Sequence, residues 1–528
     1  MIYLVAPSYH DEASRIVKPA LERSCGFGQV QRVGIVQWMR LQSEYSGFLS
    51  VVINPPEVWA EAIVQTLRKP SNKTLIFGEL PPTLANALHA IVSPLDESLR
   101  EAVNCTGAVA HSQENSQLSI EFIKSDELGK SPLSQRACLR YDFMEEWNNL
   151  GFGAVRANDS IWSLTQVVQL QKKNLLAALK LQNKIIGAYA GLWFDKSVSS
   201  TLLWFNRSVG PVDSHEWRLV ERFLSDHGYP DISCQPVLSE IPFGHEAAVT
   251  MRLDCDEDIE SARPLWKVYQ KMNVPFSLAI HTRTLLNERH HILPREVIAH
   301  GGSLLSHTAT HAPHWGGNYA TAFEEGRISA DVIEQTTGHR VRYAVSPFHQ
   351  TPVYARAGLY DAGYEGCIGG IISNDDDFLM ARSGVPPEGL PGFIGHSQQC
   401  MLHGDCMLDG EDPLQIFKQA FNAAKSSRTF FGYLDHPFSE RYQYGWKCED
   451  QRISMHRMFV EYIKAHCDVL FTNENDAMDF LLDRSSIKVS SNTQGFSISV
   501  PSTIRSHLIQ SVEYAGSRYP LPTQGLDL

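Results

Sequence analysis

Short hydrophobic runs alternate with amphipathic helical patterns through residues 1–245. Buried strands are predicted at 2–8, 47–54 and 73–80, and helices at 56–69 and 81–92, where apolar residues recur at helical spacing. A looser stretch around 106–135, which contains Ser and Gln, precedes a second segment with strands at 184–194 and 200–209. A helix at 215–227 follows, with Ser214 as its N-cap and Gly228 at its end. We expect an N-terminal α/β region over 1–245, divisible into two subdomains near 106–135.

From residue 246 the alternation becomes more regular. Apolar strand patterns occupy 247–255, 275–280, 302–307, 341–346, 366–372, 429–434 and 468–472, and helical patterns lie between most of them. About seven strand–helix units, with polar residues where the strands end, predict a parallel (β/α) barrel with its chemistry on that face. Beyond a helix at 474–484, short alternating runs predict a β-rich appendage. The expected fold is therefore α/β, with the N-terminal region at 1–245, the barrel at 246–484 and the appendage at 485–528.

Composition narrows the class of protein. Hydrophobic residues make up 43% and charged residues 20% of the chain, which excludes disordered and fibrous proteins. A net charge of −13 argues against a nucleic-acid partner, because phosphates need surfaces rich in Lys and Arg. No stretch approaches the roughly 20 apolar residues of a transmembrane segment, and the first residues lack the pattern of a signal peptide. With ten scattered cysteines and no C-x-x-C pair, we expect a cytoplasmic protein with reduced thiols.

The strand at 247–255 ends in acidic residues. Because side chains alternate along a strand, Asp254 and Asp256 share one face, whereas Cys255 points the other way as a buried packing residue. Two neighbouring carboxylates repel each other unless a cation or a proton separates them. The alternative interpretation is a solvated acidic loop that caps the next helix.

Two histidine-bearing segments follow other predicted strands. His307 and His311 are four residues apart, so one helical turn would place both imidazoles on the same side to grip a divalent ion. His436 follows the strand at 429–434 and would open onto the same barrel face. Each histidine alone is more often a loop or packing residue. A carboxylate pair and these histidines within one barrel are much harder to obtain by chance.

Together these residues predict one class of chemistry. Asp256, His307 and His311 form a His₂-carboxylate ligand set that suits catalytic zinc first, with cobalt, nickel or manganese as other occupants. A metal there lowers the pKa of water and polarises a carbonyl. Asp254 is then the general base, and His436 is the general acid that protonates the departing amine. The sequence predicts metal-assisted hydrolysis of an amide or ester.

In this order the three clusters resemble the NodB-homology polysaccharide deacetylases, carbohydrate esterase family four, over roughly residues 246–484. Asp254-Cys255-Asp256 is similar to the first family motif, Ser306-His307-Thr308-Ala309-Thr310-His311 to the second, and Leu434-Asp435-His436 to the last. The resemblance implies a distorted (β/α)₇ barrel. It also implies the same roles for these residues, and removal of N-acetyl groups from an N-acetylated glycan or glycan precursor.

The chain departs from the family pattern in two motifs. The third motif falls at Val345-Ser346-Pro347-Phe348, where Val345 stands in place of the arginine that braces the catalytic aspartate in relatives. Arg342 and His349 are candidates to replace it, and the resemblance assigns the backbone N–H of Phe348 to the oxyanion. The fourth motif has no clear counterpart. Asn374-Asp375-Asp376-Asp377 is a weak candidate, and the stretches 396–399 and 403–405 are candidates to line the groove instead.

Two further residues are candidates for substrate contact. Trp315 follows the second motif at the predicted mouth of the site, where it either stacks on a sugar ring or packs in its loop. His281 ends the strand at 275–280 and either lines the same face or caps the next helix.

Two other functions remain open from the sequence. The same barrel could hydrolyse another non-peptide carbon–nitrogen bond, such as that of a small ureide or formamide. Alternatively, the barrel is a catalytically degenerate glycan-binding or assembly module, as the loss of the arginine at Val345 indicates. Residues 1–245 would recruit a biosynthetic partner or recognise the glycan, and their pattern does not choose between these roles.

Overall fold

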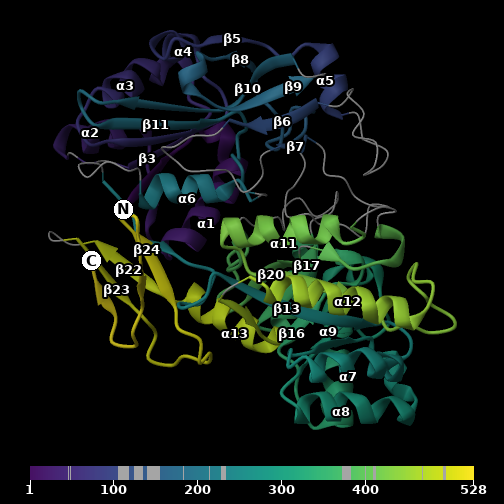
Figure 1. The fold of residues 1–528 in the computed structure, drawn as a ribbon. Coiled ribbons are helices and arrows are strands. Elements are labelled where there is room, and N and C mark those ends of the chain that lie inside the picture. The colour runs from purple at the N-terminus through teal and green to yellow at the C-terminus, as the bar shows by residue number, and fades with distance from the viewer. Residues whose placement is uncertain are drawn as a thin grey trace.

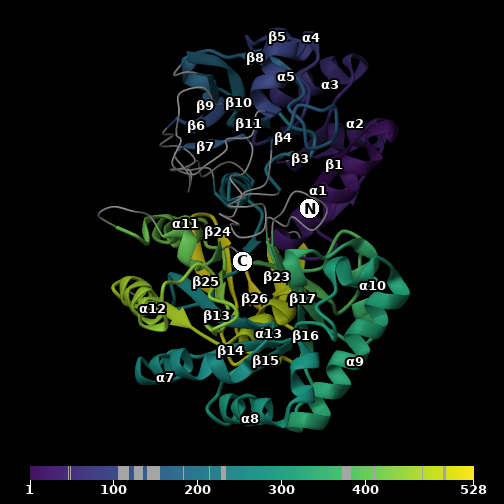
Figure 2. The same ribbon diagram turned by 90° about the vertical axis from the view of Figure 1, so that its right-hand side faces the viewer.

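The structure is a computed structural model. It describes residues 1–45, 47, 49–104, 118–123, 135–138, 155–181, 184–212, 215–226, 233–370, 382–398, 400–407, 412–466, 468–491 and 495–528. An N-terminal α/β layer lies against a larger α/β domain, and the last strands lie beside them (Figures 1 and 2). The predicted helix ends Ser214 and Gly228, and the segment Asn374–Asp377, lie outside the described residues.

One nine-stranded sheet organises the described part of residues 1–245. Its strands, in spatial order, are β2 (Val30–Arg32), β1 (Ile2–Val5), β3 (Leu49–Ile53), β4 (Lys73–Phe77), β11 (Ser200–Phe205), β10 (Lys184–Asp195), β9 (Leu175–Leu181), β6 (Leu118–Phe122) and β7 (Gln135–Ala137). The first five run parallel and the rest pair antiparallel. Because β4 and β11 are both fully buried, each needs a neighbour on both edges, and they pair with each other. The described segments before and after 106–135 therefore share one sheet.

Helices and a small two-stranded sheet cover this sheet. They are α1 (Asp11–Cys25), α2 (Ile35–Glu44), α3 (Glu57–Leu67), α4 (Pro82–Ala87), α5 (Glu97–Asn104) and α6 (Trp217–Ser225), with β5 (Ile91–Ser93) paired to β8 (Val167–Gln169). The predicted helix at 81–92 is shorter than expected, since its last residues form β5.

The second nine-stranded sheet confirms the expected parallel (β/α) barrel domain. Its order is β18 (Ile394–Gln398), β17 (Gly366–Gly370), β16 (Tyr343–Val345), β15 (Ser303–Ser306), β14 (Ser277–Ile280), β13 (Ala247–Cys255), β20 (Phe431–Asp435) and β19 (Cys400–Met401), and β21 (Val469–Phe471) pairs with β13. All of these pairs are parallel. The flanking helices are α7 (Arg263–Lys271), α8 (Ile292–Ala299), α9 (Tyr319–Thr337), α10 (Val353–Asp361), α11 (Gln415–Ser427) and α12 (Glu449–Lys464).

The helix after β21, α13 (Glu474–Ser485), packs against the inner side of this sheet. Asn473 caps its start by accepting a hydrogen bond from the Asp476 amide, at 2.9 Å. Met478 and Leu481 share a buried cluster with Ala248 of β13. The next residue, Val249, packs instead with the outer helices, as strand alternation requires.

The chain ends in two three-stranded sheets, which confirms the β-rich segment after 485. One contains β12 (Val237–Leu238), β24 (Ser511–Tyr514) and β25 (Ser517–Pro520), and the other contains β22 (Lys488–Ser491), β23 (Phe496–Ser499) and β26 (Leu526–Asp527). β12 comes before the barrel in sequence, so the terminal strands attach to the linker that enters it.

Buried ion pairs join these parts. Arg382, just before β18, donates to both oxygens of Glu221 on α6, at 2.8 and 2.5 Å. Arg218 of α6 contacts Glu221 at 3.2 Å and Glu513 of β24 at 2.5 Å. The N-terminal layer, the barrel and the terminal strands are thus held through one network of buried charges.

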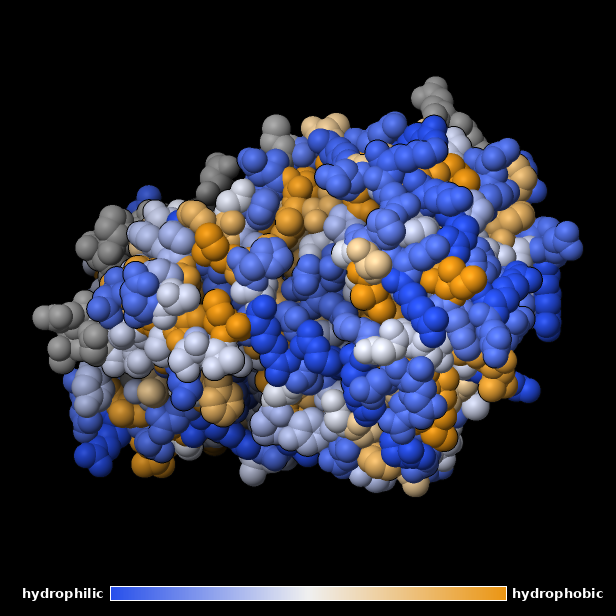
Figure 3. Space-filling model, turned by 90° about the horizontal axis from the view of Figure 1, so that it is seen from below, coloured by the Kyte–Doolittle hydropathy of each residue, from blue (hydrophilic) through white to orange (hydrophobic). Residues whose placement is uncertain are grey.

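Among the described residues, no helix is long and apolar enough to cross a membrane. On the face seen in Figure 3, hydrophobic residues form small separate areas among hydrophilic ones.

Candidate metal and catalytic site

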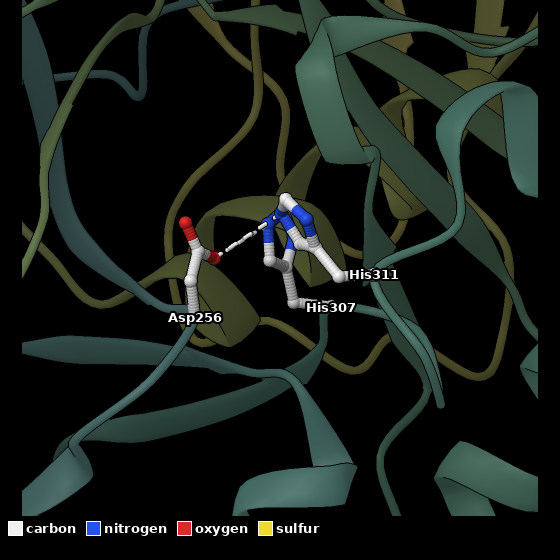
Figure 4. Close-up of side chains that lie close together, drawn as sticks. All are labelled: Asp256, His307 and His311. Atoms are coloured by element: carbon white, nitrogen blue, oxygen red, sulfur yellow. Dashed lines mark ion pairs between the residues drawn. The ribbon is translucent and has the colours of Figure 1, made fainter.

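Three side chains from two strand ends converge at the carboxyl edge of the barrel sheet. Oδ1 of Asp256, just after β13, lies 3.3 Å from Nε2 of His307 and 3.3 Å from Nε2 of His311. Figure 4 shows the carboxylate and both rings pointing toward one another. One ligand atom from each residue lies within 4.8 Å of the others. The structure therefore brings together the three metal ligands predicted from the sequence.

The two histidines meet through a loop and not through a helical turn. Residues 307–312 have no helical structure, and Thr308 and His311 have φ angles of +65° and +57°. Glu325 of α9 holds the loop: its carboxylate accepts from the amides of Ala309 and Thr310, at 2.8 and 2.9 Å. The two rings therefore lie close together, but the helical turn that the sequence suggested for them is not present.

The backbone of β16 orients one ligand. Nδ1 of His307 lies 3.1 Å from the carbonyl oxygen of Val345. Since a carbonyl can only accept, Nδ1 carries the proton and Nε2 presents its lone pair to Asp256. Val345 therefore contributes its main chain to the site, although its side chain cannot replace an arginine.

The residues fit a divalent cation by their own chemistry. Within the described residues, Asp256 Oδ1 is buried and accepts no well-formed hydrogen bond, although two imidazole nitrogens face it. Burial alone would raise the pKa of Asp256, and hydrogen bonds from His307 and His311 in their protonated form lower it well below its ordinary value. When their Nε2 atoms carry no proton, a cation between the three groups would take over that role. A partly buried carboxylate facing two imidazole nitrogens is the donor set of a metal site with open positions.

Asp254 is braced from its own strand. Arg252 Nε donates to Oδ1 of Asp254 at 2.7 Å, and Nη2 donates to Oδ2 at 3.3 Å. Burial raises the pKa of the Asp254 carboxyl, but Arg252 and then His307 bring it below its ordinary value. Asp254 is therefore ionised and held in one orientation, as a general base must be.

Arg252 thus supplies the positive charge beside Asp254 that the valine at position 345 cannot supply. Of the two expected replacements, Arg342 instead pairs with Asp479 at 2.7 Å, which corrects that prediction. His349 is partly buried near Arg252 and Asp254, and its pKa falls to about 3, mainly through loss of solvation. A neutral imidazole cannot supply the positive charge, whereas Arg252 does.

His436 lies on the other side of Asp256, with Nε2 at 3.5 Å from Oδ2. The ring of Tyr444 stacks on it at 3.9 Å and 8°, and the Tyr444 hydroxyl donates to Asp256 Oδ2 at 3.1 Å. Burial lowers the pKa of His436, and Asp256 and then Asp254 oppose this shift. Tyr444 was missed by sequence reasoning, and its place in the loop after β20, at the carboxyl edge, is the signal that could have found it.

The preceding residue, Asp435, anchors the His436 segment. Its carboxylate lies 2.9 Å from Nε2 of His456 and accepts from the backbone N–H of His436 at 2.7 Å. Arg452 donates to the His436 carbonyl at 2.8 Å. These buried contacts fix the direction in which the His436 ring leaves the strand.

Trp315 does not contact solvent. Its exposed fraction is 0%, and it packs within the main barrel core, so of the two interpretations the structure favours packing over stacking on a sugar. Phe348 lies at the site: its ring centroid is 4.9 Å from that of His311, and its φ is +53°. The backbone of Phe348 therefore stays a candidate for contact with the reacting carbonyl.

The other polar residues expected to line the site, His281, His396 and His403, make contacts within the protein. Nδ1 of His281 lies 2.8 Å from the Asp256 carbonyl oxygen, so this histidine supports a ligand. His396 is buried against Ser383, and His403 is buried against the backbone of Asp405. Burial lowers their pKa values to about 3 and about 4, and both side chains are almost fully shielded from solvent.

Several solved structures each match less than half of the chain. An allantoinase is 15% identical with a TM-score of 0.34, covering 46% of this chain and 92% of its own. A family 4 acetyl xylan esterase from Clostridium thermocellum, in complex with cobalt, is 11% identical with a TM-score of 0.30, covering 44% and 89%. A chitin deacetylase from Colletotrichum lindemuthianum is 12% identical with a TM-score of 0.30, covering 43% and 87%.

No protein-family model and no curated protein matches the chain. The likeness to polysaccharide deacetylases that the motifs predicted recurs among the solved structures. At these identities and TM-scores it carries no conclusion about activity. The function proposed below depends on the geometry of the site.

Proposed function

We propose that this protein is a metal-dependent hydrolase that removes N-acetyl groups from an N-acetylated glycan or glycan precursor. The observation that supports this most is the convergence of Asp256, His307 and His311, with Asp254 and His436 beside the same group of ligands. The resemblance of these residues to the deacetylase motifs supports an N-acetyl group as the target.

Asp256, His307 and His311 would hold the ion, and zinc is the first choice for two imidazoles and one carboxylate. When bound, a divalent metal supplies a Lewis acid that makes water more acidic and polarises an amide carbonyl.

The protein's own groups would move the protons. Asp254 accepts a proton from the attacking water as the water oxygen bonds to the carbonyl carbon, and Arg252 keeps the carboxylate in place. The backbone N–H of Phe348 donates to the developing oxyanion. His436, in its protonated imidazolium form, then gives a proton to the nitrogen as the carbon–nitrogen bond breaks, which releases acetate and a free amine. Asp254 returns its proton to solvent, and His436 takes one up, before the next cycle. Such acid and base steps typically contribute about 10²–10⁴-fold each.

The test is acetate release by the full chain. Zinc-loaded protein is incubated with N-acetylated chito-oligosaccharides, and acetate is measured enzymatically, with Asp254→Asn as the inactive control. We expect release by the wild type and a loss of at least about 10²-fold in the variant. Small ureides and formamides form a second arm, and turnover of these alone would replace the proposed substrate. No release from any acetylated sugar by folded, metal-loaded protein would overturn the proposal.

A further inference from the structure

A cavity of about 300 Å³ lies between the N-terminal layer and the barrel, away from the candidate metal site. Helix α1, the segment at 383–389 before β18 and the end of α13 line it, and none of the proposed metal or acid–base residues does so. Its charged lining residues are almost all basic: Arg15, Lys18, Arg23, Arg32 and Arg484, against Glu22. In a chain with a net charge of −13, this concentration of positive charge points to an anionic ligand.

Two of these cations are buried. Arg23 is 7% exposed; its Nη1 donates to the Val385 carbonyl at 3.2 Å, and its Nε is buried with no hydrogen-bond partner in the described structure. Arg484 is 1% exposed and donates to the backbone carbonyls of Leu238, Ser239 and Ser383, at 2.9 to 3.1 Å. Among the described residues, neither arginine has a carboxylate within ion-pair distance.

A buried guanidinium without a counter-ion is costly. Burial, followed by the neighbouring Arg484, lowers the pKa of Arg23 to about 9, although Glu240, Glu388 and Glu22 oppose the shift. An anion bound in the cavity would supply the missing counter-charge.

The other residues that line the cavity indicate which further chemical groups a ligand would carry. Lys18 pairs with Glu22 at 2.8 Å, and Arg15 and Arg32 share Asp11, all at least partly exposed, so these pairs are weak and free to rearrange. The apolar lining residues, glycines aside, are Pro19, Phe27, Leu238, Val385, Pro386 and Pro387. The cavity therefore combines a cationic end with apolar walls.

We propose that this cavity binds a small organic phosphate monoester. Its phosphoryl group would lie against Arg23 and Lys18, and its carbon skeleton would lie against Pro386 and Pro387. A dianion fits several cations better than a single carboxylate does, and the planar guanidinium matches phosphate oxygens in pairs. Because the cavity is lined from both sides, the ligand would bridge the N-terminal layer and the barrel.

The probe is phenyl phosphate, and its binding to the full chain is measured by isothermal titration calorimetry. Inorganic phosphate and benzoate are the comparison probes. We expect phenyl phosphate to bind at least about tenfold more tightly than either, because only it offers both a dianion and an apolar body. Equal binding of inorganic phosphate or of benzoate would overturn the proposed ligand class, as would the absence of binding to folded protein.

Variants locate the binding site. Arg23→Gln and the rim variant Lys18→Gln should each weaken phenyl phosphate binding about tenfold, whereas Arg340→Gln, an exposed arginine on the barrel surface, should not. Lys18→Gln keeps the test valid if the buried variant does not fold. The His307→Ala/His311→Ala protein should bind phenyl phosphate as the wild type does. Loss of binding there, or normal binding in both cavity variants, would place the phosphate elsewhere and overturn the proposal.

Discussion

Asp254 depends on an arginine two positions earlier in its own strand. Side chains alternate along β13, so Arg252 and Asp254 share the inner face, and the guanidinium reaches both carboxylate oxygens. The positive charge expected from the segment at Val345 thus comes from the strand that carries Asp254 itself. A valine at 345 therefore does not by itself indicate a degenerate site.

Changing Arg252 tests this assignment. Arg252→Lys keeps a positive charge but loses the paired donors, so we expect kcat to fall about 10- to 100-fold while metal content is unchanged. Steady-state kinetics of acetate release and elemental analysis of the same sample check this. Arg342→Lys is the matched control, because Arg342 pairs with Asp479 away from the site. Wild-type kcat in folded Arg252→Lys would refute the bracing role.

Tyr444 supports a proposed ligand through its hydroxyl group. Tyr444→Phe removes the donor to Asp256 Oδ2 but keeps a ring that can stack on His436. We expect metal affinity to fall about tenfold, as is typical when a partner of a ligand is lost. Competition with a chromogenic chelator measures the affinity, and Tyr442→Phe, in the same loop, serves as the control. An unchanged affinity would show that the hydroxyl does not hold Asp256.

The sequence predicted the residues that end strands and missed those that support them. Asp254, Asp256, His307 and His436 follow apolar runs closely, so the barrel pattern alone places them at one edge. Tyr444 comes from a long loop, and its place depends on packing that no local pattern records. The burial of Trp315 was likewise not predictable, because its position after the second motif does not show whether its side chain faces solvent or the core.

At the scale of elements, the loop 307–311 depends on helix α9. Glu325 accepts from two loop amides and from the Thr310 hydroxyl, which is 2.7 Å away. This contact permits the left-handed backbone at Thr308 and His311 that turns both rings toward Asp256. The four-residue spacing of His307 and His311 does not reflect a helical turn, because the two rings meet at Asp256 through a loop.

Glu325→Leu tests this support. The two loop amides lose their acceptor, so we expect folding to be destabilised by about 1–3 kcal/mol and metal affinity to drop. Urea unfolding and metal titration measure both effects, with Glu324→Leu, the exposed neighbour, as the control. Unchanged metal affinity in Glu325→Leu would mean that the loop holds its shape without the carboxylate.

Element prediction failed where the local pattern was weak. β18 has the sequence Ile-Gly-His-Ser-Gln, which carries too few apolar residues to indicate a strand. The helix α13 was predicted, but its place on the inner side of the sheet depends on the shape of the barrel.

At the scale of the whole molecule, Arg382 and Glu221 join the barrel to the N-terminal layer. Burial alone would raise the pKa of Glu221, but Arg382 and then Arg218 lower it from its ordinary 4.5 to about 2. A carboxyl whose pKa is depressed in the folded state stabilises folding above its unfolded pKa. That stabilisation, about 3 kcal/mol, is lost as the pH falls from about 4.5 to 2.

Arg382→Met leaves Glu221 buried without its main partner. We expect a loss of about 3–5 kcal/mol at pH 7, and this difference from the wild type should shrink as Glu221 is protonated at acid pH. Urea unfolding at pH 7 and at pH 4 measures it, with the exposed Arg340→Met as the control. A difference that does not change with pH would show that the Glu221 charge is not the cause.

The measurement that tests the central claim most directly is the metal content of the purified full chain, after incubation with zinc. We predict about one divalent ion per chain in the wild type and in His314→Ala, and almost none in His307→Ala/His311→Ala. A folded wild type that takes up no metal, or a double variant that binds as much as the wild type, would contradict the proposed site and with it the hydrolytic mechanism.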